Sequence, residues 1–258
     1  MATMCTMTHR CGGAMLIILL VILACSSLPT MEASTDKPRK VVIAFPIFEN
    51  IAMLDAVGPY EILHSLPYVE AVFVSFKRGP VSDLQRTMTL EAKATFDEVP
   101  SPDVVVVPGG FGARKLLNNT VILNWIRKAH KTTMYTTSVC TGGLLMGAAG
   151  LLEGIDATTH WASLPLLANY GANPVSHRVV RQGKIITSAG VSSGIDMAIS
   201  LAALLSNDFD AQTAQLLNEY DPQPPFNTGT KSKASPALVA KVLELLDAQN
   251  AKLNGTAT

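Results

Sequence analysis

The chain has 258 residues, of which 48% are hydrophobic and 16% are charged, a composition that fits one globular domain or at most two small ones. Its 20 basic and 20 acidic side chains cancel to a formal net charge of zero, and no stripe of lysines and arginines stands out. These features exclude nucleic acid as an expected partner.

The first forty residues differ in kind from the rest. His9 and Arg10 precede a short apolar run from Met15 to Ala24, which predicts a secretory or lipoprotein signal region over residues 1–33, followed by a short polar segment. We therefore expect an exported protein, secreted or periplasmic. Two cleavage readings stay open: a lipobox that leaves Cys25 lipidated, the one expected membrane contact, or cleavage by signal peptidase near Ala24 or after Ala33. An uncleaved anchor is a third alternative.

The cysteines divide the chain in the same way. Cys5, Cys11 and Cys25 lie in or beside the signal region, so Cys140 is the single thiol of the remaining chain. No disulfide can form within a domain that holds one cysteine. The exported part must instead be stabilised by a hydrophobic core of ordinary size.

From residue 40 onward, apolar strands alternate with helices. The expected strands cover residues 40–45, 69–77, 103–107, the segment before Cys140, and a hairpin over 175–188, with a more polar strand or hairpin over 87–96. Helices are expected after Gly58-Pro59, over 116–130, after Cys140, through 164–170, and over 195–205, 208–220 and 238–253. Uninterrupted apolar strands are typical of parallel sheets buried on both faces. The sequence thus predicts a single three-layer α/β domain over residues 40–253.

The expected helix over 116–130 is the most clearly amphipathic one. Its residues Leu117, Val121, Trp125 and Ile126 recur at helical spacing along one face. We expect this face to pack on the sheet.

The stretch from Met134 to Leu152 carries the strongest functional signal. A Thr- and Val-rich strand meets Cys140, and Thr141, Gly142 and Gly143 then lead directly into a helical segment. A thiol at such a turn lies at a helix N-terminus, where free backbone N–H groups favour the thiolate, as in the nucleophile elbow of hydrolases. The alternative is an inert buried cysteine.

Two further turns follow predicted strands. Asp55 lies between the first strand and the first helix, where open α/β sheets gather ligand groups, although a helix N-cap or an ordinary turn residue is the alternative. Gly109 and Gly110 follow the strand at 103–107, and consecutive glycine N–H groups can bind a substrate or an anion. No Gly-Lys-Ser/Thr follows them, which argues against a phosphate loop.

His160 is a candidate catalytic base in the segment Ala157-Thr-Thr-His-Trp161. No spacing in the sequence brings its ring to Cys140, so a structural role is favoured.

Three separated motifs, Leu54-Asp55-Ala-Val-Gly-Pro59, Val107-Pro-Gly-Gly110 and Thr137-Ser-Val-Cys140-Thr-Gly142, resemble those of the ThiJ/PfpI superfamily of class I glutamine amidotransferase-like domains. The segment Ala157 to Trp161 fits the same pattern, and Glu219 to Phe226 is similar to its isonitrile hydratase branch. The resemblance runs from Lys40 to about Ala237. It implies a flavodoxin-like α/β/α sandwich with a mostly parallel sheet and a nucleophile elbow at Cys140.

The resemblance also implies roles for residues. Cys140 would be the nucleophile, Asp55 its acid/base partner, and Thr141 the polar residue that follows the nucleophile, with Gly109 and Gly110 binding the substrate. Peptidase-like and glyoxalase-like members often carry His after the cysteine or Glu in place of the aspartate, so Thr141 and Asp55 argue against those activities. The implied reaction is hydration of an isonitrile to an N-substituted formamide: the Cys140 thiolate attacks the terminal carbon while Asp55 protonates it, with N–H groups of Gly110 and Thr141 as donors.

The remaining expectations follow from the same resemblance. The partner is a small-molecule substrate, no cofactor and no metal are expected, and the family implies a homodimer. Another cysteine hydrolase, a carbonyl-detoxifying enzyme and a non-catalytic exported binding domain remain alternatives. Regulators of the AraC type carry a similar domain, but they add a helix-turn-helix module that the sequence does not show.

Overall fold

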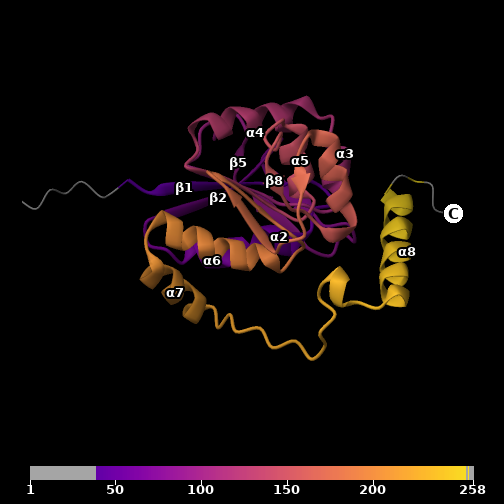
Figure 1. Cartoon of the computed structure of the whole chain (residues 1–258). Helices are drawn as coiled ribbons and strands as arrows, with labels where there is room; N and C mark the ends of the chain where they lie inside the picture. Colours follow the sequence, from indigo (N-terminus) through magenta and orange to yellow (C-terminus); the bar gives the residue numbers. More distant parts are fainter. Residues whose placement is uncertain (1–38, 254, 256–258) are drawn as a thin grey trace, which may run out of the picture. The chain divides into compact units, whose positions relative to one another are not determined.

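The computed structural model describes residues 39–253 and Gly255, which form one compact unit (Figure 1). The predicted signal region at residues 1–33, including Cys25, lies outside the described residues. Among the helices that the structure describes, none has both the length and the apolar character needed to cross a membrane.

A seven-stranded sheet forms the middle layer, in the order β10-β11-β7-β6-β1-β2-β5. Every neighbouring pair is parallel except the hairpin of β10 and β11. The strands are β1 (Val41–Pro46), β2 (Val69–Ser75), β5 (Ala94–Thr95), β6 (Val104–Val107), β7 (Tyr135–Val139), β10 (Val179–Gln182) and β11 (Ile185–Ser188). The mostly parallel sheet expected from the apolar runs is confirmed.

The described residues also form two small two-stranded sheets outside the main sheet. The first pairs β3 (Gly79–Ser82) with β4 (Thr89–Ala92) in antiparallel fashion, and the second pairs β8 (Asp156–Ala157) with β9 (Asn173–Pro174) in parallel. The polar segment over 87–96 therefore supplies one strand of a hairpin, β4, and the edge strand β5 of the main sheet.

Helices cover both faces of the sheet and bury two separate cores (Figure 1). One face carries α2 (Met53–His64), α6 (Ser193–Leu205) and α7 (Asp208–Leu217). The other carries α3 (Phe111–Lys115), α4 (Thr120–Thr132), α5 (Gly142–Ala148) and the 3₁₀ helix η1 (Trp161–Tyr170). Because both faces are covered, all four valines of β6 are fully buried. The predicted three-layer, flavodoxin-like sandwich is confirmed.

Helix α4 begins later than the sequence pattern predicted. The Asn119 side chain caps it by accepting hydrogen bonds from the first free backbone N–H groups, one of them that of Val121. Trp125 and Ile126 are buried as expected, but Val121 is 55% exposed, so its predicted place on the inward face is wrong. The residues before Asn119 belong instead to a turn after the short helix α3, which periodicity did not predict.

The C-terminal part departs from the layered pattern. After α7 the chain runs through a long segment containing only the short η2 (Lys231–Lys233) and ends in α8 (Pro236–Leu253) (Figure 1). Helix α8 has no buried residue, and Leu245 on it is 52% exposed. A hydrogen bond of 2.8 Å from Lys115 Nζ to the Leu253 carbonyl oxygen ties its end to α3.

Candidate active site

The turn between β7 and α5 places Cys140 at the carboxyl edge of the sheet. Cys140 has φ = 56°, in the left-handed region that side chains other than glycine rarely adopt. Its backbone N–H donates to the Ala189 carbonyl oxygen at 2.7 Å, and Thr159 Oγ1 donates to its carbonyl oxygen at 2.5 Å. These bonds hold the strained conformation. The strand, sharp turn and helix expected from the sequence are present.

Close packing of two turns makes this elbow possible. A Cβ atom on Gly142 would lie 2.1 Å from the Val107 carbonyl oxygen, at the end of β6. Only glycine therefore lets α5 begin so close to the neighbouring strand. The carboxyl ends of β6 and β7 meet here, next to β1, where the strand order reverses and open α/β sheets bind ligands.

Asp55 enters the site from the first turn of α2 and is fully buried. Its Oδ2 accepts the Gly109 N–H at 3.0 Å, whereas Oδ1 has no hydrogen-bond partner in the described part of the chain. Burial raises the pKa of Asp55 to about 7, against the opposing effects of the Gly109 N–H and the nearby Cys140 side chain. A carboxyl group with this pKa can give or take a proton near neutral pH.

Thr141 fastens the glycine turn to the elbow. Its Oγ1 accepts the Gly110 N–H at 2.8 Å and donates to the Gly110 carbonyl oxygen at 3.0 Å. Gly110 has φ = 120°, and a Cβ there would lie 2.3 Å from the backbone nitrogen of Ala52. The Gly110 N–H expected to face the substrate is thus already bonded within the protein. The hydrogen bonds between Thr141 and Gly110 therefore position the turn that carries Cys140.

The Cys140 thiol is only 6% exposed, and its electrostatics differ from the sequence expectation. Burial, followed by the charge of Asp55, raises the pKa of the thiol, while hydrogen bonds from the backbone N–H groups of Thr141 and Val191 oppose that rise. The thiolate expected from the helix N-terminus alone is therefore not the resting form. At neutral pH the thiol stays protonated and Asp55 titrates first.

Val191 is a site residue that the sequence did not reveal. It precedes α6, and its positive φ of 42° belongs to a turn that directs its backbone N–H to the sulfur. The sequence placed this segment at a helix N-terminus and gave no sign that it faces Cys140. A donor contributed by backbone leaves no side-chain signal, so composition and spacing could not have found it.

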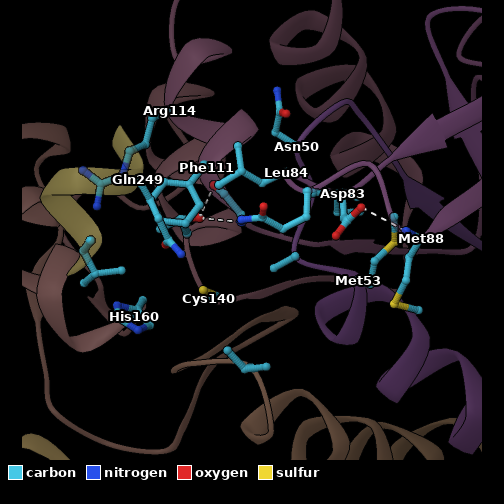
Figure 2. Close-up of a pocket in the computed structure, with 17 residues that line it drawn as sticks. Asn50, Met53, Asp83, Leu84, Met88, Phe111, Arg114, Cys140, His160 and Gln249 are labelled. Atoms are coloured by element: carbon cyan, nitrogen blue, oxygen red, sulfur yellow. Dashed lines mark hydrogen bonds between the residues drawn. The ribbon is translucent and has the colours of Figure 1, made fainter. Parts of the chain in front are cut away.

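A cavity of about 350 Å³ opens above Cys140 (Figure 2). Its walls are largely apolar, and its polar members lie on separate sides of the opening. The lining residues are Asn50, Ile51, Ala52, Met53, Asp83, Leu84, Gln85, Met88, Gly110, Phe111, Arg114, Cys140, Thr141, His160, Val191, Leu246 and Gln249. Since Leu246 and Gln249 belong to α8, the C-terminal helix contributes to the wall.

The sequence left two roles open for His160, a catalytic base and a structural residue, and the position of its ring bears on both. Its Nδ1 accepts the Ala162 N–H at 3.3 Å, which caps η1 and makes the residue structural, as favoured. The ring also lines the cavity (Figure 2), although no hydrogen bond joins it to Cys140. Burial, followed by the charge of Arg114, lowers the pKa of His160, so the ring is neutral at neutral pH.

The described residues contain no cluster of three or more His, Cys, Asp or Glu side chains that could hold a metal ion. Four side chains at this site could act on a ligand: the thiol of Cys140, the carboxyl of Asp55, the imidazole of His160 and the guanidinium of Arg114.

Known proteins share this fold and much of this sequence. The DJ-1/PfpI family model matches residues 40–204. An isonitrile hydratase from Pseudomonas putida is 44% identical over 197 residues, covering 76% of this chain and 86% of the relative. A transcriptional regulator from Pseudomonas aeruginosa, CdhR of the HTH type, is 26% identical over 166 residues, covering 62% of this chain and 48% of the regulator.

The solved structures lead to the same family. The crystal structure of a ThiJ/PfpI family protein from Pseudomonas syringae superposes with a TM-score of 0.78 and 33% sequence identity, covering 91% of this chain and 98% of that one. The match of the family model to residues 40–204, together with the sheet order and the elbow at Cys140, shows that the chain belongs to the DJ-1/PfpI family.

Proposed function

We propose that the chain is an isonitrile hydratase-like enzyme, a hydro-lyase that adds water to an isonitrile to give an N-substituted formamide. The observation that carries the proposal is the pairing of the Cys140 thiol with the buried Asp55 carboxyl below a largely apolar cavity. The 44% identity to the Pseudomonas putida isonitrile hydratase supports the same reaction.

The thiol and carboxyl pair matches what an isonitrile requires. The terminal carbon of an isonitrile accepts a nucleophile and a proton at the same atom. Above pH 7 the pair holds one proton, and the form with a thiolate and a protonated Asp55 is a tautomer of the form with a thiol and a carboxylate. A Cys140 that is protonated in the free enzyme can therefore still attack as a thiolate, once its proton has moved to Asp55, which then acts as the acid.

The first step joins sulfur to the terminal carbon. The sulfur lone pair forms the C–S bond, Asp55 delivers its proton to the same carbon, and a thioimidate results. The N–H groups of Thr141 and Val191, which are directed at the sulfur, stabilise its negative charge before attack. Asp55 is left as a carboxylate.

Water completes the reaction. Asp55 takes a proton from water as the oxygen bonds to the thioimidate carbon, and it passes that proton to the nitrogen. The second proton of the water stays on the new hydroxyl group and is the one that the sulfur of Cys140 receives when it leaves. The C–S bond then breaks, Cys140 leaves and recovers its proton, and the carbon becomes the formyl group of the product. The sum is one isonitrile and one water to one formamide, with the enzyme unchanged.

A substrate panel tests the proposal. Wild type and Cys140→Ala would be assayed on alkyl and aryl isonitriles, with formamide detected by mass spectrometry, and on methylglyoxal and simple amides. Formamide production by wild type alone supports the proposal. Full activity of Cys140→Ser on an isonitrile would refute the covalent route, and turnover of only methylglyoxal or an amide would assign another cysteine chemistry to the scaffold.

Two further proposals concern the compartment and assembly. We propose export, directed by residues 1–33, and self-association as a homodimer; the first rests on the sequence pattern and the second on family resemblance. Cell fractionation with N-terminal sequencing of the mature protein tests the first. Analytical ultracentrifugation of residues 39–258 tests the second, and a purely monomeric sedimentation profile at micromolar concentration would refute it.

A further inference from the structure

Arg114 brings a positive charge to the cavity wall without a counterion. The side chain extends from α3, is half-buried, and lines the cavity above Cys140 (Figure 2). Its Nη2 donates to Oγ of the buried Ser163 at 2.9 Å. Among the described residues no carboxylate lies within ion-pair distance of Arg114. Arg127 and Arg181 also lack an acidic partner in that part of the chain, but both are exposed to solvent. The arginines with an acidic partner are Arg39, Arg78, Arg86 and Arg178.

A half-buried guanidinium without a carboxylate partner is costly unless a ligand supplies the missing negative charge. The Ser163 hydroxyl satisfies one of its N–H groups and none of its charge. Among the described residues that line the cavity, Asp83 is the one acidic side chain, and its oxygens accept hydrogen bonds from the N–H groups of Thr87 and Met88. In Figure 2 Asp83 lies on the opposite side of the cavity from Arg114.

His160 adds a donor near the same side of the cavity. Because Nδ1 accepts the Ala162 N–H, the proton of the neutral ring is on Nε2. No hydrogen bond to Nε2 is present in the described part of the chain, and Gly190 packs against this edge of the ring. Figure 2 shows Arg114, Gln249 and His160 along one side of the cavity, with Met53 and Met88 on the other.

We infer that the substrate carries a carboxylate, bound by the Arg114 guanidinium and the His160 Nε2–H, on the group attached to its isonitrile nitrogen. The isonitrile part of this inference rests on the proposed function; the carboxylate part rests on Arg114 and His160. The class is an isonitrile carboxylic acid with an apolar side chain, which the walls of Met53, Met88 and Phe111 accommodate. The corresponding product is an N-formyl amino acid.

A matched pair of substrates tests the carboxylate. The potassium salt of a 2-isocyano acid with a leucine side chain and its methyl ester differ in charge at one end only. We expect wild type to favour the acid in kcat/KM, and Arg114→Met to lower the acid-to-ester ratio about 30-fold, the factor expected for losing a hydrogen bond to a charged group. Lys128→Met removes an equal charge from an exposed site outside the cavity and should leave the ratio within about 3-fold, since surface charges are screened.

A second readout needs no turnover. The affinities of N-formyl-leucine and its methyl ester for wild type and Arg114→Met would be measured by isothermal titration calorimetry. Tighter binding of the acid than of the ester by wild type, lost in the variant, supports the inference. Should Arg114→Met fail to fold, as thermal unfolding would show, Arg114→Lys keeps the charge but loses the planar fork and should lower both the kcat/KM ratio and the preference for binding the acid by a smaller factor.

The two assays separate the two proposals. If no isonitrile is hydrated but the acid binds more tightly than its ester and this preference depends on Arg114, the proposed function is wrong and the carboxylate site stands. If isonitriles are hydrated, yet acid and ester react equally and Arg114→Met leaves the ratio unchanged, the proposed function stands and the carboxylate site is refuted, leaving Arg114 as a structural partner of Ser163.

Discussion

The floor and the C-terminal wall of the cavity are built in opposite ways. The floor joins three distant chain segments, at Asp55, Gly109–Gly110 and Cys140–Thr141, through buried and partly buried hydrogen bonds. The wall from α8 supplies Leu246 and Gln249 from a helix with no buried residue, tied to α3 by the bond from Lys115. Hydrogen bonds between segments hold the proposed reacting groups, Asp55 and Cys140, in place, whereas few contacts hold the α8 side of the cavity wall.

The contrast predicts a division of labour. A floor of buried residues joined by hydrogen bonds between distant segments has a high local free energy of opening, whereas a helix with few buried contacts opens at low cost. We therefore expect changes in the floor to act on the chemical step or on folding, and changes in α8 to act on substrate binding alone. Four variants test this division, in order of decreasing effect.

Removing the nucleophile should have the largest effect. We expect Cys140→Ala to lower kcat on an isonitrile by about 1,000-fold or more, because the covalent step is lost. The free energy of unfolding in urea should stay close to that of wild type. A variant that retains a tenth of the activity would show that sulfur takes no covalent part.

A substitution that disrupts the packing beneath Cys140 should have the next largest effect. Gly142→Ala places a Cβ 2.1 Å from the Val107 carbonyl oxygen, and we expect it to lower the free energy of unfolding by about 4 kcal/mol or to abolish folding. Gly229→Ala is the matched control, since nothing lies within 4 Å of a Cβ there and its φ is ordinary. Urea denaturation of both variants measures the difference; equal stability would mean that the floor is looser than its contacts indicate.

The titration of Asp55 gives a pH dependence of calculable sign. Its folded pKa of about 7 exceeds the ordinary 3.8, so the folded protein binds this proton more tightly than the unfolded chain. The contribution to stability is therefore greatest below pH 4 and is lost as the pH rises to about 7, on the order of 4 kcal/mol in all. Asp55→Asn should remove this slope from a series of urea denaturations between pH 4 and pH 8.

The same group shapes the activity profile. Because the reactive pair holds one proton, kcat/KM of wild type should rise with pH up to about 7, and at pH 6 should be about 10-fold below its plateau. An activity that falls through pH 7 instead would mean that the fully protonated pair is the reactive form.

The wall should give the smallest effect. We expect Leu246→Ala to raise KM about 3-fold through lost apolar contact, with the free energy of unfolding changed by less than about 1 kcal/mol. Leu245→Ala, the exposed neighbour outside the cavity, serves as the control and should change neither quantity. If Leu246→Ala instead lowered kcat alone, α8 would be part of the rigid floor.

The floor could be predicted from the sequence because its parts are local. Asp55 follows a strand, Gly109 and Gly110 follow another, and Cys140 stands where a strand turns into a helix, so the parallel topology alone brings them to one edge. The three layers followed from uninterrupted apolar strands for the same reason.

The remainder depends on contacts that no local pattern encodes. Val191 takes part through its backbone, and Arg114 lies on the short helix α3, which the periodicity did not predict. Leu246 lines the cavity through the placement of a helix that buries almost nothing of itself. The thiolate was expected from the helix terminus, but burial and Asp55 outweigh that effect.

The left-handed backbone of Cys140 also bears on how such a domain can change over generations. A side chain at φ = 56° costs about 1 kcal/mol, which glycine would not incur and asparagine would incur only in part. Replacing the cysteine by either residue therefore relieves strain while removing the thiol. A chain with either residue would keep the fold and the cavity but would lack the thiol. If Cys140 is the nucleophile, as proposed, the reaction requires a residue that its own backbone conformation disfavours.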